Sequence, residues 1–169
     1  VNLGSEDESK IYQLSPGSKI SYTVQKEFFS KPGEVITATT NSFDLDLDLQ
    51  ENLLSVEASL DTGTLDSGNA DRDNHVVNDL GQFINIKVDN FEVDLLEQST
   101  FTAPVLLTIN NVDKVVNFQI ESEVTENETS FVGTSNINMK DFGVKPPSFA
   151  GVYSVNENVE LAFDIKVTN

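Results

Sequence analysis

The chain has 169 residues with 28 acidic and ten basic side chains, and its formal net charge is −18. Such a negative field repels nucleic acids and anionic lipid surfaces, so neither is expected as a partner. No apolar run approaches the roughly 20 residues of a membrane helix, so no direct bilayer insertion is expected. The absence of cysteine excludes disulfides, cysteine metal sites and thiol nucleophiles.

One domain is expected from a chain of this length, of which 38% is hydrophobic. The polar residues 1–9 are predicted to be a flexible N-terminal segment, and residues 10–169 to form the domain. Because the chain begins at Val1 without a methionine or a signal peptide, we expect it to be a mature chain.

The first half of the chain alternates between apolar and polar residues, which predicts strands with one buried face. Five strands are expected there: 10–14, 19–26, 35–39, 43–49 and 53–60. The clearest is 43–49, where Phe43, Leu45, Leu47 and Leu49 alternate with aspartates. A parallel sheet that is covered on both faces would not show this pattern.

A short polar helix is predicted over residues 70–77, after the alternation ends. Asp66 or Ser67 is its expected N-cap, because a short side-chain oxygen can accept a hydrogen bond from the first turn. An isolated helix of this length is marginal in water, so tertiary contacts must hold it.

The helix contains the single arginine and the single histidine of the chain, Arg72 and His75, on one helical face. We interpret Arg72, Asp73 and His75 first as a structural clasp that holds the helix against the strands. A contact of Arg72 with a polar ligand headgroup is the second interpretation, because guanidinium offers a rigid fork of donors.

Further strands are predicted after the helix, and a change of phase at Asp89-Asn90 indicates a β-bulge. A hairpin is expected around Asn110-Asn111, and the remaining strands are 129–139 and 158–167. Residues 142–153 look irregular. These elements predict an all-β antiparallel barrel or sandwich; closure into a barrel would remove exposed edges.

Several motifs together resemble the YceI-like family. They are Asp61-Thr62-Gly63 followed by the letters SGNADRDNHV, residues 107–112 with 114–116, and residues 140–144. The resemblance extends from about Lys10 to the C-terminus and implies an extended, eight-stranded, lipocalin-like barrel with a short helical insert. It also implies a polyisoprenoid ligand, such as a polyprenyl quinone or polyprenyl phosphate, and a bacterial periplasmic or otherwise exported protein.

The charge of the chain favours one of these ligands. Nine lysines and one arginine face 28 carboxylates, so a phosphorylated headgroup would enter an unfavourable field. A neutral, quinone-like headgroup is therefore favoured for a protein that binds, transports or stores such an amphiphile.

The apolar strand faces could line a ligand cavity or simply fill a core. Eleven phenylalanines and no tryptophan offer plain apolar surface with few polar groups. The candidate ligand-binding residues are Phe43, Leu45, Leu47, Phe91, Phe118, Phe131, Phe142 and Phe163, with Arg72 and His75. An interaction domain with a filled core stays open as an alternative, and so does a homodimer.

An enzyme that acts on a small apolar substrate through His75 and a carboxylate is a further alternative. A structural role of His75 is favoured over it, and no catalytic residue is assigned. One histidine without cysteine disfavours zinc. Asp44, Asp46 and Asp48 lack the later glycine and glutamate of a calcium loop and are interpreted as a solvated face. No metal or cofactor is expected.

Overall fold

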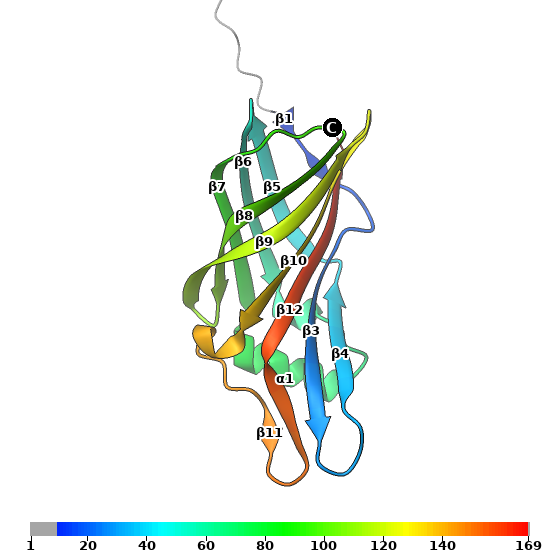
Figure 1. Ribbon diagram of the computed structural model, residues 1–169, viewed down its shortest axis with the longest axis vertical. Helices are drawn as coiled ribbons and strands as arrows, with labels where there is room; N and C mark the ends of the chain where they lie inside the picture. The colour runs from blue at the N-terminus through cyan, green and yellow to red at the C-terminus, as the bar shows by residue number, and fades with distance from the viewer. Residues whose placement is uncertain (1–9, 169) are drawn as a thin grey trace, which may run out of the picture.

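The computed structural model describes residues 10–168, which form one curled antiparallel sheet (Figure 1). The predicted N-terminal segment 1–9 lies outside the described residues. The longer strands are β3 (Lys19–Phe28), β4 (Glu34–Thr40), β5 (Phe43–Gln50), β6 (Leu53–Asp61), β7 (Phe83–Glu92), β8 (Gln98–Ile109), β9 (Val112–Val124), β10 (Glu128–Asn138) and β12 (Tyr153–Thr168). The two-residue strands are β1 (Lys10–Ile11), β2 (Gln13–Leu14) and β11 (Ser148–Phe149).

The strands follow the order β1-β5-β6-β7-β8-β9-β10-β12-β3-β4. Among the described residues, β4 and β5 do not pair, so the sheet stays open between these edges. Two links cross this opening. Tyr12 joins β1 on β5 to β2 on β12, and Thr39 of β4 exchanges backbone hydrogen bonds of 3.1 and 3.0 Å with Asp66.

This architecture confirms the expected all-β, lipocalin-like barrel, although the strand count differs from the expected eight. Residues 10–168 contain nine strands of at least seven residues, and the sheet does not close by pairing of β4 with β5. No helix within this range is long and apolar enough to cross a membrane.

Local sequence features set the register of the sheet. Leu54 pairs with Phe91 and Val56 with Val88, so Asp89 and Asn90 together oppose one residue and form the predicted bulge. The β8–β9 hairpin turns at Asn110 and Asn111, whose φ angles are 52° and 58°. Asparagine tolerates this left-handed backbone, which two-residue hairpins with the right twist require. Both sequence predictions are therefore confirmed.

In the described part of the chain, three helical segments interrupt the strands: η1 (Thr62–Thr64), α1 (Ala70–Leu80) and η2 (Met139–Phe142). The predicted N-cap of α1 was wrong. Asn69 caps the helix, accepting a hydrogen bond of 3.0 Å from the Arg72 amide. Asp66 instead accepts from the Gly68 amide at 2.8 Å, within the loop that precedes the helix. The helix runs to Leu80, three residues further than predicted.

The molecule is elongated and has two different ends (Figure 1). One end carries the C-terminus and the hairpin turns β5–β6 and β9–β10. We call the other the helical end, because α1 and η2 lie there with the hairpins β3–β4 and β11–β12. Inward-facing apolar side chains from most strands form the main core between the two ends.

Candidate ligand-binding site

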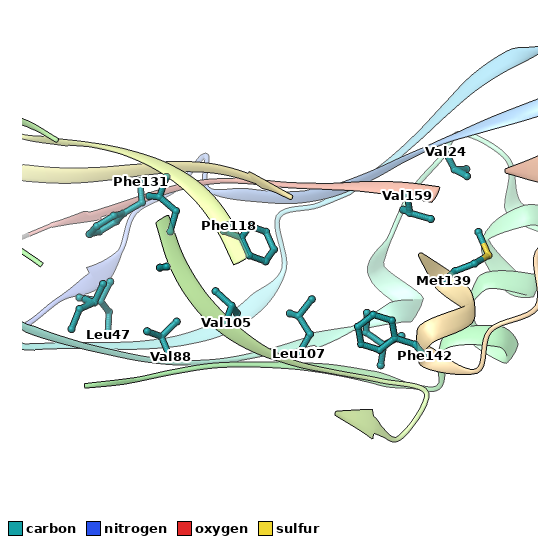
Figure 2. Close-up of a cluster of buried hydrophobic side chains, with 14 of the residues drawn as sticks. Val24, Leu47, Val88, Val105, Leu107, Phe118, Phe131, Met139, Phe142 and Val159 are labelled. Carbon is teal, nitrogen blue, oxygen red and sulfur yellow. The ribbon is translucent and has the colours of Figure 1, made fainter. Parts of the chain in front are cut away.

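An apolar cavity of about 140 Å³ lies inside the curled sheet. Its lining comes from β3, β5, β6, β7, β8, β9, β10 and β12, together with Leu65 in the loop before α1. Alternation explains this wall, because inward positions of neighbouring strands meet on the concave face. Ser21 and Tyr22 are its polar members, and no charged residue of the described chain lines it. Figure 2 shows several wall residues, from Leu47 and Phe131 to Leu107.

The helical end of the interior is filled with side chains. Phe142 is 1% exposed, and Met139, Val24 and Val159 are buried with it (Figure 2). The Asn110 side-chain amide donates to the Phe142 carbonyl at 3.2 Å, which fixes η2 against the β8–β9 turn. We call these residues the end plug: Val24, Met139, Phe142 and Val159.

Tyr22 is a titratable residue of the cavity wall, and its pKa is strongly raised. Burial, and next the negative charge of Asp73, raise the pKa of Tyr22 to about 12, while Arg72 acts in the opposite direction. A phenol with such a pKa stays protonated at neutral pH. The cavity surface is formed by apolar atoms alone, so Tyr22 contributes its ring to the wall and not its hydroxyl.

Contacts of Arg72 and Asp73 tie α1 to the surrounding loops. An Arg72 Nη2 atom lies 3.4 Å from Glu34 Oε1, and Nη1 donates to Ser67 Oγ at 3.5 Å. Both Asp73 carboxylate oxygens accept from the Ser67 amide, at 3.2 and 3.1 Å. His75 is exposed, and no hydrogen bond or ion pair within residues 10–168 involves it.

The structure brings five of the predicted ligand-binding residues into the cavity wall: Leu45, Leu47, Phe118, Phe131 and Phe163. The other predicted phenylalanines do not line it. Phe43 packs against the small cluster around Ala38 and Leu60, and Phe91 stacks on Phe101 with ring centroids 5.9 Å apart. Phe142 belongs to the end plug. Arg72 and His75 also lie outside the lining.

Sequence reasoning missed wall residues that are as prominent as the predicted ones. Tyr22, Phe101, Val105 and Leu107 all line the cavity. Alternation in β3 and β8 carried the signal that could have identified them, since each lies at an inward position of its strand. The predicted site favours phenylalanines, whereas the wall is made by consecutive inward positions of each strand, whatever their residue type.

Candidate metal ligands and His75 can be placed relative to the cavity. Within residues 10–168, no group of three or more His, Asp or Glu side chains is placed to hold a metal ion. His75 lies on the exposed side of α1, away from the cavity lining. The cavity offers shape and apolar surface, which suits the binding of an apolar group.

A curled antiparallel sheet around an apolar interior, with one short helix near one end, defines a lipocalin-like barrel. The chain belongs to the family of YceI-like domains, whose family model matches residues 12–167. The match covers every strand that lines the cavity.

Solved structures share this fold. A polyisoprenoid binding domain from Saccharophagus degradans implicated in plant cell wall breakdown has a TM-score of 0.72 and 12% identity, covering 93% of this chain and 97% of that one. Burkholderia cenocepacia BcnA has a TM-score of 0.69 and 14% identity, covering 88% and 95%. A search of curated proteins found no match.

Proposed function

We propose that this protein binds the apolar chain of a polyisoprenoid-type lipid inside the barrel and so stores or carries it. The observation that carries the proposal is a cavity wall without charged groups, built by eight strands of the described chain. A similar fold in a domain described as polyisoprenoid binding, from Saccharophagus degradans, supports the choice of ligand class. The filled-core alternative is less favoured, because the interior retains open volume.

The size of the cavity bears on how a ligand would enter. About 140 Å³ is close to the volume of engineered apolar cavities that bind benzene, so it accommodates only part of a long chain. A longer ligand must displace wall side chains, and the rings of Phe118 and Phe163, whose centroids are 5.6 Å apart, are the bulkiest close pair. Binding therefore requires side-chain movement within the wall.

A neutral headgroup fits this interior better than a phosphate. No lysine or arginine of residues 10–168 lines the cavity, and Arg72 is engaged with Glu34. The cavity surface is formed by apolar atoms alone, so it offers no compensation to a charged headgroup. A dianionic phosphate would need cationic partners to offset its desolvation. We therefore favour a polyprenyl quinone over a polyprenyl phosphate.

The test uses protein purified from bacteria, with native mass spectrometry to detect a retained lipid. Titration with a polyprenyl quinone and a polyprenyl phosphate of equal chain length then compares their affinities. Ala103→Phe adds a ring to the wall at a position that is 1% exposed. Val115→Phe is the matched control, because Val115 is 68% exposed on the outer surface.

We expect the quinone to bind more tightly than the phosphate, Ala103→Phe to weaken binding at least tenfold, and Val115→Phe to have no effect. Absence of binding by either lipid, or equal affinity of the wild type and Ala103→Phe, would rule out the barrel interior as the lipid site. A periplasmic or exported location belongs to the same proposal, and cell fractionation of the source organism tests it.

A further inference from the structure

The hairpins β3–β4 and β11–β12 lie side by side at the helical end (Figure 1), and exposed apolar side chains gather at their turns. The Phe29 amide donates to the Val152 carbonyl at 3.2 Å, which links the β3–β4 turn to the β11–β12 turn. Phe29 is 73% exposed, Phe149 62% and Val152 47%. We call this surface the hairpin tip: Phe29, Phe149 and Val152 with the neighbouring Lys26 and Lys31.

The hairpin tip contrasts in charge with the rest of the molecule. Residues 142–156 contain no carboxylate, and Lys145 is their only charged residue. Segments 26–35 and 142–156 together hold three of the nine lysines but two of the 28 carboxylates. One of these two, Glu34, is paired with Arg72 at 3.4 Å. These two segments therefore carry one more positive than negative side chain on a chain whose net charge is −18.

Lysines at the tip lie over aromatic rings. Lys26 Nζ is 4.3 Å from the ring centroid of Tyr153 and 5.0 Å from that of Phe28. Lys31 Nζ is 4.2 Å from the Phe28 centroid. Aromatic rings beside lysine ammonium groups are the combination found where proteins meet the headgroup region of a bilayer.

We propose that the hairpin tip docks the protein onto the surface of an anionic lipid bilayer. Phe29, Phe149 and Val152 would enter the interface between headgroups and acyl chains, while Lys26 and Lys31 would contact phosphate groups. The proposal rests on this surface alone and does not depend on which ligand the cavity binds.

A bilayer fits the tip better than a second copy of the chain does. Three exposed apolar side chains make a small patch, whereas stable protein interfaces bury about 1,200–2,000 Å² in total. A symmetric tip-to-tip pair would also bring like-charged lysines together. A fluid headgroup region, in contrast, accepts a few side chains without a complementary shape.

The net charge does not prevent such docking. Charges beyond about 8 Å are largely screened at physiological ionic strength. The molecule is elongated, so the acidic barrel wall extends away from a bilayer touched by the tip (Figure 1).

Vesicle flotation of the whole chain tests the proposal, with phosphatidylcholine vesicles compared with vesicles that also contain phosphatidylglycerol. The variant Phe29→Ser/Phe149→Ser removes the largest apolar groups, and Lys26→Gln/Lys31→Gln removes the charges. Leu96→Ser is the matched control, since Leu96 is 66% exposed in the β7–β8 connection. Melting temperatures and sedimentation velocity are measured for each protein.

We expect the wild type and Leu96→Ser to float with phosphatidylglycerol vesicles, and both tip variants to lose binding several-fold with melting temperatures near that of the wild type. Added salt should reduce the binding. No flotation of the wild type, or equal flotation of all variants, would overturn the proposal. Equal binding to phosphatidylcholine alone would also overturn it. A dimer that the aromatic tip variant dissociates, without vesicle binding, would identify a second copy as the partner instead.

Discussion

At the scale of single residues, Tyr22 has a strongly raised pKa. The folded protein raises the Tyr22 pKa from 10.0 to about 12, chiefly through burial. A group with a raised folded pKa contributes stability that is complete below its unfolded pKa and is lost as pH rises through the folded pKa. Between about pH 10 and 12 the unfolded chain therefore releases this proton more readily, and the free energy of unfolding falls.

Tyr22→Phe should remove the Tyr22 share of this alkaline loss. A shift of two units corresponds to about 2.7 kcal/mol, and partial exposure reduces this to at most about 2 kcal/mol. Urea unfolding at several pH values between about 8 and 12 measures it, with tyrosinate absorbance as a direct titration. Tyr12→Phe is the comparison variant: burial also raises the Tyr12 pKa, so this change should lessen the alkaline loss too, at a different site. Parallel stability curves for the wild type and Tyr22→Phe would contradict the assignment.

The clasp residues of α1 should differ in their contributions to stability. Asp73 accepts from the Ser67 amide through both carboxylate oxygens. Arg72 Nη2 forms a partly exposed ion pair with Glu34 Oε1 at 3.4 Å. Removing an ionised acceptor from a backbone amide costs about 1–2 kcal/mol, and a surface ion pair contributes about 0–1 kcal/mol. We expect Asp73→Ala to destabilise more than Arg72→Ala, and His75→Ala to have almost no effect.

Hydrogen exchange over residues 69–77 measures this order directly. Faster exchange is expected for Asp73→Ala and, to a smaller extent, for Arg72→Ala, with thermal unfolding measured in parallel. If Arg72→Ala left exchange and melting unchanged but abolished lipid binding or an enzymatic turnover, α1 would be a functional site instead of a clasp.

At the scale of elements, substitutions in β5 can distinguish its inward face from its outward face. Leu47 is buried at 9% exposure and lines the cavity, whereas Asp46 is exposed on the outer face. Leu47→Asp should destabilise the protein by several kcal/mol, because an unpaired charge enters an apolar interior. Asp46→Asn should change the free energy of unfolding by less than about 1 kcal/mol. Equal melting temperatures would show that the faces are assigned wrongly.

A glycine faces an aromatic ring where β10 pairs with β12. Gly133 lies opposite Phe163, and a Cβ atom on Gly133 would overlap the Phe163 ring. The ring thus covers the glycine, a known way to fill an inward glycine in a sheet. Gly133→Ala should push the ring towards the cavity, destabilise the protein by about 1–3 kcal/mol and weaken lipid binding.

The double variant Gly133→Ala/Phe163→Leu separates crowding from an effect on the backbone. Leucine leaves room for the added methyl group, so the two changes should cost less together than their sum. Denaturant unfolding of both single variants and the double variant completes the cycle. Strict additivity would mean that the ring and the glycine are not coupled.

Sequence periodicity predicts the strands and turns more accurately than it predicts which residues line the cavity. It identified the faces of β5, the bulge at Asp89-Asn90 and the turn at Asn110-Asn111, because each depends on neighbours along the chain or on one residue's backbone preference. Alternation says which face is inward but not how far along the barrel a residue lies. Alternation therefore predicts Phe142 as cavity wall, although it fills the end plug.

The polar contacts were also beyond sequence reasoning. Asn69 caps α1 because the loop before it is held at Thr39 by the Asp66 backbone, a contact between segments 27 residues apart. The influence of Asp73 on Tyr22 likewise joins α1 to β3. Such contacts depend on how the sheet curls, which no local pattern specifies.

At the scale of the whole molecule, acidic charge is spread over the outside of a barrel whose interior is apolar. Asp46 of β5 lies directly opposite Glu57 of β6, and like charges in a cross-strand pair are destabilising. Lys87 lies 4.0 Å from Glu57 and offsets only part of this repulsion. The fold therefore carries electrostatic self-repulsion in addition to the net charge of −18.

Because this repulsion is between exposed charges, sodium chloride should stabilise the fold. We expect the melting temperature to rise steeply as the screening length falls to about 8 Å and then to level off, since screening acts first on well-separated charges. Asp46→Lys should raise the melting temperature at low salt and flatten this dependence, because it turns the repulsive pair with Glu57 into an attractive one. Thermal unfolding of both proteins across a salt series measures the effect. The same salt should weaken vesicle docking by the hairpin tip. Added salt is therefore expected to raise the melting temperature and to lower vesicle binding. A melting temperature that falls with salt, or an equal slope for Asp46→Lys, would show that other forces outweigh the surface charge.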